Sequence, residues 1–316
     1  MLRRWLAFVV VALALVGCGG ASPDVVSPDD SARVEPVVVE PPPRARDTAE
    51  RAAAIVGAKV RVVVHVDRLK DHPLAPRLVS MKAWGGIFEA TGIDPLEDVD
   101  RAFVAAKNAR DQRAVIAVAE HHVDEQRMKA AIDQLVAESG ADGRLLPELG
   151  VLAAKVNVRG RQSVVLAVTP TLLVVTSDDF AQAATTLAST GGLPEPTGPE
   201  AALAHVDRPS DTLKAPRAPR IPKTIHRADA TVTMAPDGGA DVVIVGQSTD
   251  AAQAVIDAKA LTEEIDRATT VKVAIVKIRA FDPVKFAATE DRVEGRRHVS
   301  SSELNTLLGF VEMMAK

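Results

Sequence analysis

The stretch DATVTMAPDGGADVVIVG, residues 229–246, decides the fold class of this 316-residue chain. Two runs rich in β-branched residues, 229–235 and 240–246, flank the sequence Pro-Asp-Gly-Gly. An Asp-Gly pair between two such runs is typical of a tight turn that joins antiparallel strands. The stretch therefore predicts a β-hairpin, and we expect a helix over residues 249–267 directly after it.

The same order of elements occurs earlier in the chain. Ser177 follows a set of apolar runs and is placed to begin a helix. A further amphipathic helix is expected between Met128 and Val136, where the apolar residues share one face. Ser300 and Glu303 have the spacing of a capping box for the last helix, and Asp47 and Glu50 have it for the first. Strands are predicted at 60–66, 99–106, 114–119, 151–158, 163–169, 171–176, 229–235, 240–246, 271–279 and 292–299.

Strand-strand-helix units thus repeat along the chain, in two blocks at 47–192 and 228–316. Short connections between strands imply antiparallel pairing, and the helices of such units can pack together on one face of a sheet. We therefore predict an α+β protein with antiparallel sheets and helices on one face. The order of elements in each block is compatible with a ferredoxin-like fold. Residues 193–227, rich in proline and basic residues, are expected to be a connector.

The N-terminus has the features of an export signal. Arg3 and Arg4 precede an apolar run at 6–16, which is too short to span a bilayer. The run ends in Leu15-Val16-Gly17-Cys18, and with these four residues the N-terminus resembles that of bacterial lipoproteins. The resemblance covers the first 18 residues and implies that a signal peptide, 1–17, is removed and that Cys18 is lipidated.

The same resemblance implies a place in the cell envelope. Gly19 follows the cysteine, and in the sorting rule of enteric-type lipoproteins this implies transport to the outer membrane, facing the periplasm or the cell surface. Cys18 is the only cysteine in the chain, so neither a disulfide within the protein nor a thiol-based active site is expected. Residues 18–46 are rich in proline and are expected to be a tether.

Composition argues against one class of partner. The formal net charge is −4, and the chain has no tyrosine. General nucleic-acid binding needs a basic face, and single-strand binding needs aromatic side chains on which bases stack. We therefore expect no nucleic-acid partner.

The sequence KAPRAPRIPK, residues 214–223, has a basic residue at every third position. The polyproline II helix has three residues per turn and rises about 3.1 Å per residue, so the cations would line one edge about 9 Å apart. Three interpretations remain open: a connector whose apolar edge packs on the fold, a binding site for an anionic envelope component or protein, and a ligand for a proline-binding partner. The cations are Lys214, Arg217, Arg220 and Lys223.

Two weaker candidates for binding remain. His122 and Glu125 could contribute to a metal site, but Asp124 and Glu125 also fit the first turn of a helix, where negative charge is favoured. We therefore expect no metal and no cofactor.

Trp84 precedes a Gly-Gly pair, and it is either an exposed partner contact or a core residue.

Catalytic motifs are weak. Residues 246–250 follow a strand and precede a helix, as a nucleophile elbow does, but the second glycine is missing and Ser248 or Thr249 is expected to cap the helix. The prediction is a membrane-anchored lipoprotein of the envelope with a non-enzymatic binding or scaffold role. The alternative is an envelope hydrolase whose site is assembled from residues far apart in the sequence.

Overall fold

The computed structural model describes residues 45–80, 91–108, 111, 113–158, 161–214, 219–273, 276–279 and 284–314. The predictions for the signal peptide, Cys18, Trp84 and Arg217 lie outside these residues. Within them, no helix has both the length and the apolar character needed to cross a membrane.

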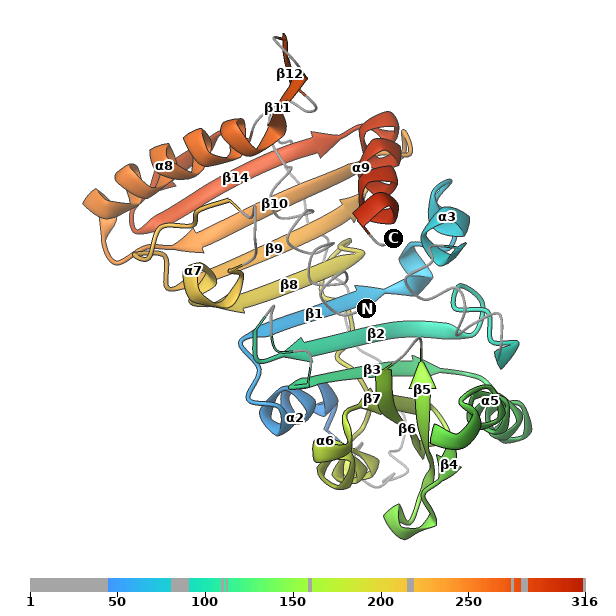
Figure 1. Ribbon diagram of the computed structural model, residues 1–316. Coiled ribbons are helices and arrows are strands. Elements are labelled where there is room, and N and C mark those ends of the chain that lie inside the picture. Colours follow the sequence, from blue (N-terminus) through green and yellow to red (C-terminus); the bar gives the residue numbers. More distant parts are fainter. Residues whose placement is uncertain are drawn as a thin grey trace, which may run out of the picture.

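Twelve strands form one antiparallel sheet, in the order β13-β14-β10-β9-β8-β1-β2-β3-β7-β6-β5-β4 (Figure 1). The predicted α+β class with antiparallel pairing is confirmed. The strands are β1 (Val60–His65), β2 (Val99–Ala106), β3 (Val115–His121), β4 (Arg144–Leu145), β5 (Leu152–Val158), β6 (Arg161–Thr169), β7 (Leu172–Thr176), β8 (Ala202–Asp207), β9 (Arg227–Met234), β10 (Ala240–Gln247), β13 (Phe286–Thr289) and β14 (Arg292–Val299). A separate pair is formed by β11 (Thr270–Val273) and β12 (Val276–Arg279).

Seven α-helices lie in the described part of the chain. They are α2 (Thr48–Ile55), α3 (Ala75–Ser80), α5 (Glu125–Glu138), α6 (Asp178–Ala184), α7 (Pro209–Thr212), α8 (Ala251–Thr269) and α9 (Ser301–Met314). Short 3-10 turns occur at Val66–Arg68, Gly140–Asp142, Pro147–Leu149 and Thr185–Ser189.

The sheet has an internal repeat centred on β1 and β8. Counting outward from the centre, one half reads β1-β2-β3-β7-β6 and the other reads β8-β9-β10-β14-β13. In both halves a helix follows the third strand, α5 after β3 and α8 after β10. The ferredoxin-like detail is not confirmed, because β1, β2 and β3 lie side by side as a simple meander.

The pairing of β8 with β1 and β9 makes one sheet of the two halves. Both β8 and α7 lie within residues 193–227, the segment expected to be a connector. Val62 and Ala230 are the two neighbours of Ala204 in β8. The connector therefore contributes a central strand.

Strand register defines the two faces of the sheet. Alternate residues point to opposite faces. One row on a single face runs across eleven strands, with each pair of neighbours in register; its residues are Ala154, Val165, Val175, Ala117, Val104, Val62, Ala204, Ala230, Ile244, Gly295 and Phe286. We call this face the α8 face, because Ile265 of α8 packs against Ala230 and Ile244. At the other end of the row, α5 packs against Ala154 and Val165.

The opposite face, which we call the α2 face, is covered by α2 and α6 in the first half of the sheet. There Phe103, Ile116, Val164 and Leu166 form a core with residues of both helices. Helices therefore occupy both faces, and the prediction that they lie on one face is wrong. The reason is visible in β6, where consecutive residues 164–166 are all buried, as in a strand covered on both sides.

In the second half of the sheet the α2 face is open. The α2-face positions of β10 and β14 alternate with buried residues and are themselves half-buried or exposed. No helix in the described part of the chain packs a hydrophobic cluster onto these positions. Most of their side chains are polar, among them Asp241, Glu294 and Arg296, and the others are Val243 and Val245.

Candidate functional site: the basic end of the sheet

Strand register brings cations from distant parts of the sequence to one end of the sheet. Arg227 pairs with Asp207 on one side and with Gln247 on the other, and Gln247 pairs with Arg292. At the same end, Lys59 accepts a backbone hydrogen bond from Asp207 and donates one to Ala106, which precedes Lys107. We call this region the basic end; its cations are Lys59, Arg61, Lys107, Arg208, Arg227 and Arg292.

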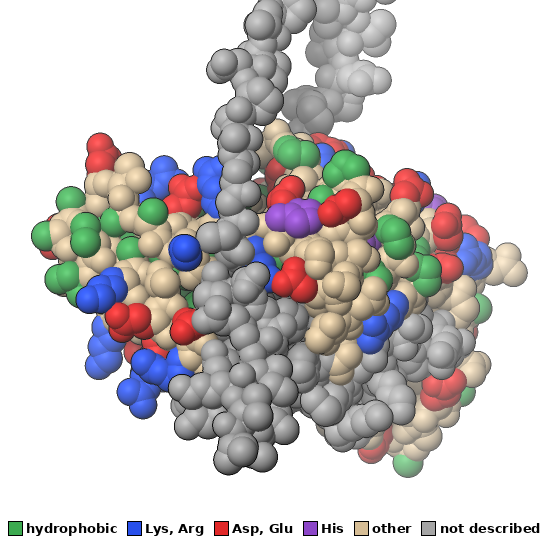
Figure 2. Space-filling view, turned by 90° about the horizontal axis from the view of Figure 1, so that it is seen from above, with side chains coloured by type: hydrophobic (Ala, Val, Ile, Leu, Met, Phe, Trp, Pro, Cys, Tyr) green, Lys and Arg blue, Asp and Glu red, His purple; other side chains and the backbone are tan. Residues whose placement is uncertain are grey.

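The cations of the basic end are exposed and largely without acidic partners. Arg227 forms an ion pair with Asp229, with 2.9 Å between Nε and Oδ2. In the part of the chain that the structure describes, no ion pair is formed by Lys59, Arg61, Lys107 or Arg292. Figure 2 shows several Lys and Arg side chains, with Asp and Glu among them, at the left, the side on which Figure 1 places the start of β1 and β14 and the end of β8.

The carboxylates nearest to these cations are engaged by a histidine. His205 lies 2.7 Å from Asp229 (Nδ1 to Oδ1) and 3.1 Å from Asp207 (Nε2 to Oδ1). The ring therefore contacts one carboxylate oxygen of each of the two aspartates beside Arg227.

The basic repeat predicted from the sequence adjoins this end. Lys214 contacts Asp211 at 2.8 Å, and this hydrogen bond lowers the pKa of Asp211, with smaller contributions from Lys223 and Arg208. Residues 215–218 lie outside the described part of the chain, and the polyproline II helix stays a prediction.

The repeat also packs on the fold. Ile221 contacts the hydrophobic cluster formed by α8 and β14, as the connector interpretation expects of the apolar edge. Arg220 is exposed, and its backbone N–H lies 3.4 Å from Oε2 of Glu264 in α8. Arg208, which donates its backbone N–H to His226, has the left-handed backbone conformation (φ 47°) that residues other than glycine rarely adopt.

A shallow depression lies where α2 ends, next to the basic end. It has a volume of about 280 Å³ and is lined by Glu50, Ala53, Ala54, Gly57, Ala58 and Arg61. Its floor is made of small residues, and its only cation is Arg61. The depression extends the accessible surface beside Arg61, but it lacks the converging polar groups of a small-molecule site.

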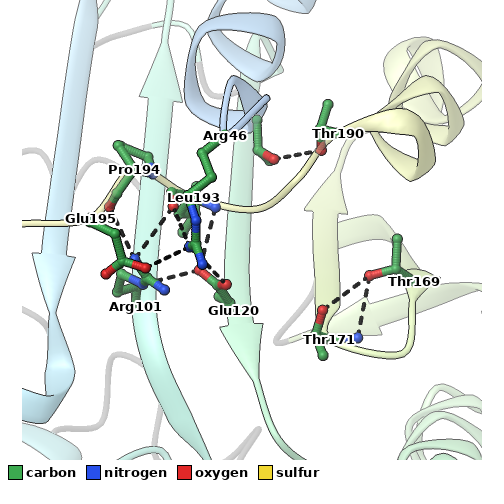
Figure 3. Close-up of polar contacts among 10 residues, drawn as sticks. Arg46, Arg101, Glu120, Thr169, Thr171, Thr190, Leu193, Pro194 and Glu195 are labelled. Atoms are coloured by element: carbon green, nitrogen blue, oxygen red, sulfur yellow. Dashed lines mark hydrogen bonds and ion pairs between the residues drawn. The ribbon is translucent and has the colours of Figure 1, made fainter. Parts of the chain in front are cut away.

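A second polar cluster fastens the N-terminal end of the described chain to the sheet (Figure 3). Glu120 contacts Arg101 at 3.0 Å, and both side chains are mostly buried, with 14% and 12% exposed. Glu195 bridges Arg101 and Arg46, with 2.8 Å to each. The backbone N–H of Leu193 donates to Glu120, and the N–H of Gly191 donates to the carbonyl of Ala45.

Burial shifts the pKa of two titratable groups in and beside this cluster. Burial raises the pKa of Glu120, and Arg101 and Arg46 oppose the rise. His65 pairs with Arg101 across β1 and β2, and burial lowers its pKa. Shifted pKa values of this kind occur in active sites. Here Leu193 and Pro194 cover the arginine with their carbonyls, so the cluster holds a loop rather than a ligand.

The two weak metal candidates lie beside the start of α5. His122 is exposed and contacts Asp100, with 3.5 Å from Nδ1 to Oδ1. Glu125 lies in the first turn of α5, where Asp124 caps the helix by accepting the N–H of Arg127. Among the described residues, no three His, Cys, Asp or Glu side chains are placed to share a metal ion.

Ser248 is not accessible as a nucleophile. It is 1% exposed, and its hydroxyl donates to Asp257, which is equally buried. Thr224 and Gln253 donate to the same carboxylate. The prediction that Ser248 or Thr249 caps α8 is wrong, because Asp250 accepts the N–H of Gln253 instead.

Comparison with known proteins gives no further guide to the site: the chain matches no protein-family model, no curated protein and no solved structure.

Sequence reasoning found the basic repeat but missed Lys59, Arg61, Lys107 and Arg292. These residues are separated by up to 233 positions in the sequence, and only the strand order makes them neighbours.

Proposed function

We propose that this chain is a lipid-anchored protein of the cell envelope that binds an anionic envelope component through the basic end. The observation that carries the proposal is a set of exposed cations at the ends of five of six adjacent strands, of which Lys59, Arg61, Lys107 and Arg292 form no ion pair with a described residue. The chain as a whole carries a net charge of −4, so this local excess of positive charge stands out.

The envelope location is proposed from the N-terminal sequence. Residues 1–17 are the proposed signal peptide, Cys18 the lipidated residue and residues 18–46 the tether, with the outer membrane as the destination and the periplasm or the cell surface as the side. The described chain begins at Ala45 on the α2 face, the face that also carries Arg61, Arg227 and Arg292. Recovery of native protein with an unmodified Cys18 thiol would contradict this part of the proposal.

The shape of the surface favours binding over catalysis. Small-molecule sites are concave and mostly apolar, whereas the basic end is an open sheet end with polar side chains. An extended or surface-bound anion can contact several of these cations at once. Exchange of the counterions held by exposed Lys and Arg makes such binding strong at low salt and weak at high salt.

The test is retention on phosphocellulose, a polyanionic resin, at about 0.05 M salt, where screening is weak. We expect the unmodified protein to be retained despite its negative net charge. A variant with Lys59→Gln, Arg61→Gln, Lys107→Gln and Arg292→Gln should elute at lower salt, because it lacks the unpaired cations.

A second variant controls for net charge. Lys129→Gln, Arg144→Gln, Lys259→Gln and Arg267→Gln remove four exposed cations elsewhere on the molecule and change the net charge by the same amount. If both variants elute together, or if the unmodified protein is not retained, the proposed function is wrong.

A further inference from the structure

The cations of the basic end lie in a row that crosses the strands. From Lys107 to Arg292 the row passes through β2, β1, β8, β9, β10 and β14. Neighbouring strands are about 4.8 Å apart, so the row is about 24 Å long. The two remaining positions in the row are Asp207, which is held by His205, and Gln247, which is neutral.

The row is narrow. One step inward along the strands, the α2-face positions are Arg61, His205, Asp229, Val245 and Glu294, which lie in register. Two of these are carboxylates, and both already contact a neighbouring cation. A broad anionic surface would meet these carboxylates as well as the cations. A strip of positive charge bordered by negative charge fits a linear anion better.

The strip is also accessible along its length. Lys59, Lys107, Arg227 and Arg292 are all exposed, and α2 ends at Ile55, before the row begins. Arg61 lies beside the strip at the edge of the depression. A chain-like ligand can therefore lie across the strand ends without moving any described helix.

We propose that the basic end binds a linear polymer with a phosphate group in each repeat, which lies across the strand ends from Lys107 to Arg292. This inference rests on the proposed function and names the class of ligand. Arginine binds phosphate through two parallel hydrogen bonds, and lysine binds it as a point charge. The row holds two lysines, Lys107 and Lys59, and two arginines, Arg227 and Arg292, with the neutral Gln247 between the arginines; cations spread over this length suit repeated phosphates rather than one compact anion.

The experiment measures how affinity depends on the length of the ligand. Inorganic polyphosphate of about 3 and about 30 units is titrated into the full mature chain in neutral detergent. Each additional contact on one chain is an intramolecular step, so the long polymer should bind at least about 10-fold more tightly per molecule. The difference should shrink as salt rises.

Two matched double variants locate the effect. Lys107→Gln with Arg292→Gln removes both ends of the row and should reduce the advantage of the long polymer to about 3-fold or less. Lys129→Gln with Lys259→Gln removes two distant cations and should leave the advantage unchanged. Both variants alter only exposed side chains, so both should fold. Circular dichroism checks this, so that a change in affinity is not due to unfolding.

The outcomes separate this inference from the proposed function. If the short and long polymers bind equally, the linear ligand is wrong while an anion site remains. If poly-glutamate of the same charge binds as tightly as the long polyphosphate, the assignment to phosphate is wrong. If neither polymer binds and phosphocellulose does not retain the protein, the proposed function fails too.

Discussion

At the scale of single residues, two histidines on the open part of the α2 face each lie between two aspartates. His205 bridges Asp207 and Asp229, as described above, near the basic end. At the opposite end of the sheet, His298 contacts Asp241 through Nδ1 and Asp237 through Nε2, both at 2.9 Å. The hydrogen bond to Asp241 raises the pKa of His298, and Asp237 raises it further.

The raised pKa predicts a stability effect that depends on pH. Below the unfolded value of about 6.5, the charged ring binds its proton more tightly in the folded state, so it stabilises the fold; this contribution is lost as pH rises through the folded pKa. Asp237 has a lowered pKa and stays ionised throughout this window. Urea unfolding should show that His298→Gln costs more at about pH 5.5 than at about pH 8.5, by less than about 1 kcal/mol because the pair is exposed.

His226 is exposed and forms no side-chain ion pair with a described residue, so it provides the control. His226→Gln should change the unfolding free energy equally at the two pH values. If His298→Gln costs the same unfolding free energy at both pH values, the two aspartates do not stabilise the protonated imidazole of His298.

Residue-level prediction succeeds where the interaction is local. The predicted capping box is confirmed: Glu303 accepts the N–H of Ser300 at 2.9 Å, within one helical turn. The equivalent box at Asp47 and Glu50 is wrong, because Asp47 pairs with Arg51 instead. The cations of the row could not be predicted, because no local pattern fixes which strands become neighbours.

At the scale of elements, α5 illustrates how a short sequence fixes the start of a helix. Asp124 has an extended backbone (φ −66°, ψ 160°), and its carboxylate accepts the N–H of Arg127 at 2.9 Å. From there the apolar residues of the helix recur on the side that faces β5 and β6. The N-cap therefore starts the helix at the residue that turns this apolar side toward the sheet.

Loss of this cap should destabilise the protein measurably. Asp124→Ala leaves an N–H at the helix start without its partner and should cost about 1 kcal/mol. Glu125→Ala changes the neighbouring exposed acid, which acts only through the helix dipole, and should cost about 0.3 kcal/mol. Thermal and urea unfolding of both variants compares the costs; an equal loss would mean that charge, not the hydrogen bond, stabilises the helix start.

Most strands could be predicted from the sequence, because hairpins are local. The predicted strands at 229–235 and 240–246 correspond to β9 and β10, and those at 151–158, 163–169 and 171–176 to β5, β6 and β7. The prediction missed β8, whose sequence ALAHVD is short and lies in a proline-rich segment. It also predicted one strand over 271–279, where two short strands, β11 and β12, are found.

At the scale of the whole molecule, the pairing of β1 with β8 decides how the two halves cooperate. Five residue pairs join the halves, from Val60 with Val206 to Val64 with Ala202. On the α8 face, Val60, Val62 and Val206 share one hydrophobic cluster with Leu213, the residue that follows α7. The order of strands in the sheet could not be predicted, because nothing local to β1 specifies a partner about 140 residues away.

The central position of β8 predicts that damage to it spreads to both halves. Ala204→Pro removes a backbone N–H from a strand paired on both sides and should cost about 3 kcal/mol or more. Hydrogen exchange should show that amides of β3 and β10 lose protection together. Ala204→Gly, which keeps the N–H, should cost about 1 kcal/mol. Loss of protection in only one half would mean that the halves are stable independently.

The attachment of Ala45 and Arg46 to residues 191–195 also has a mechanical consequence. A pull on the chain from the N-terminal side reaches this loop and α2 first, because Gly191, Leu193 and Glu195 hold the two residues. The load is thereby spread over several contacts before it reaches β1 at the centre of the sheet.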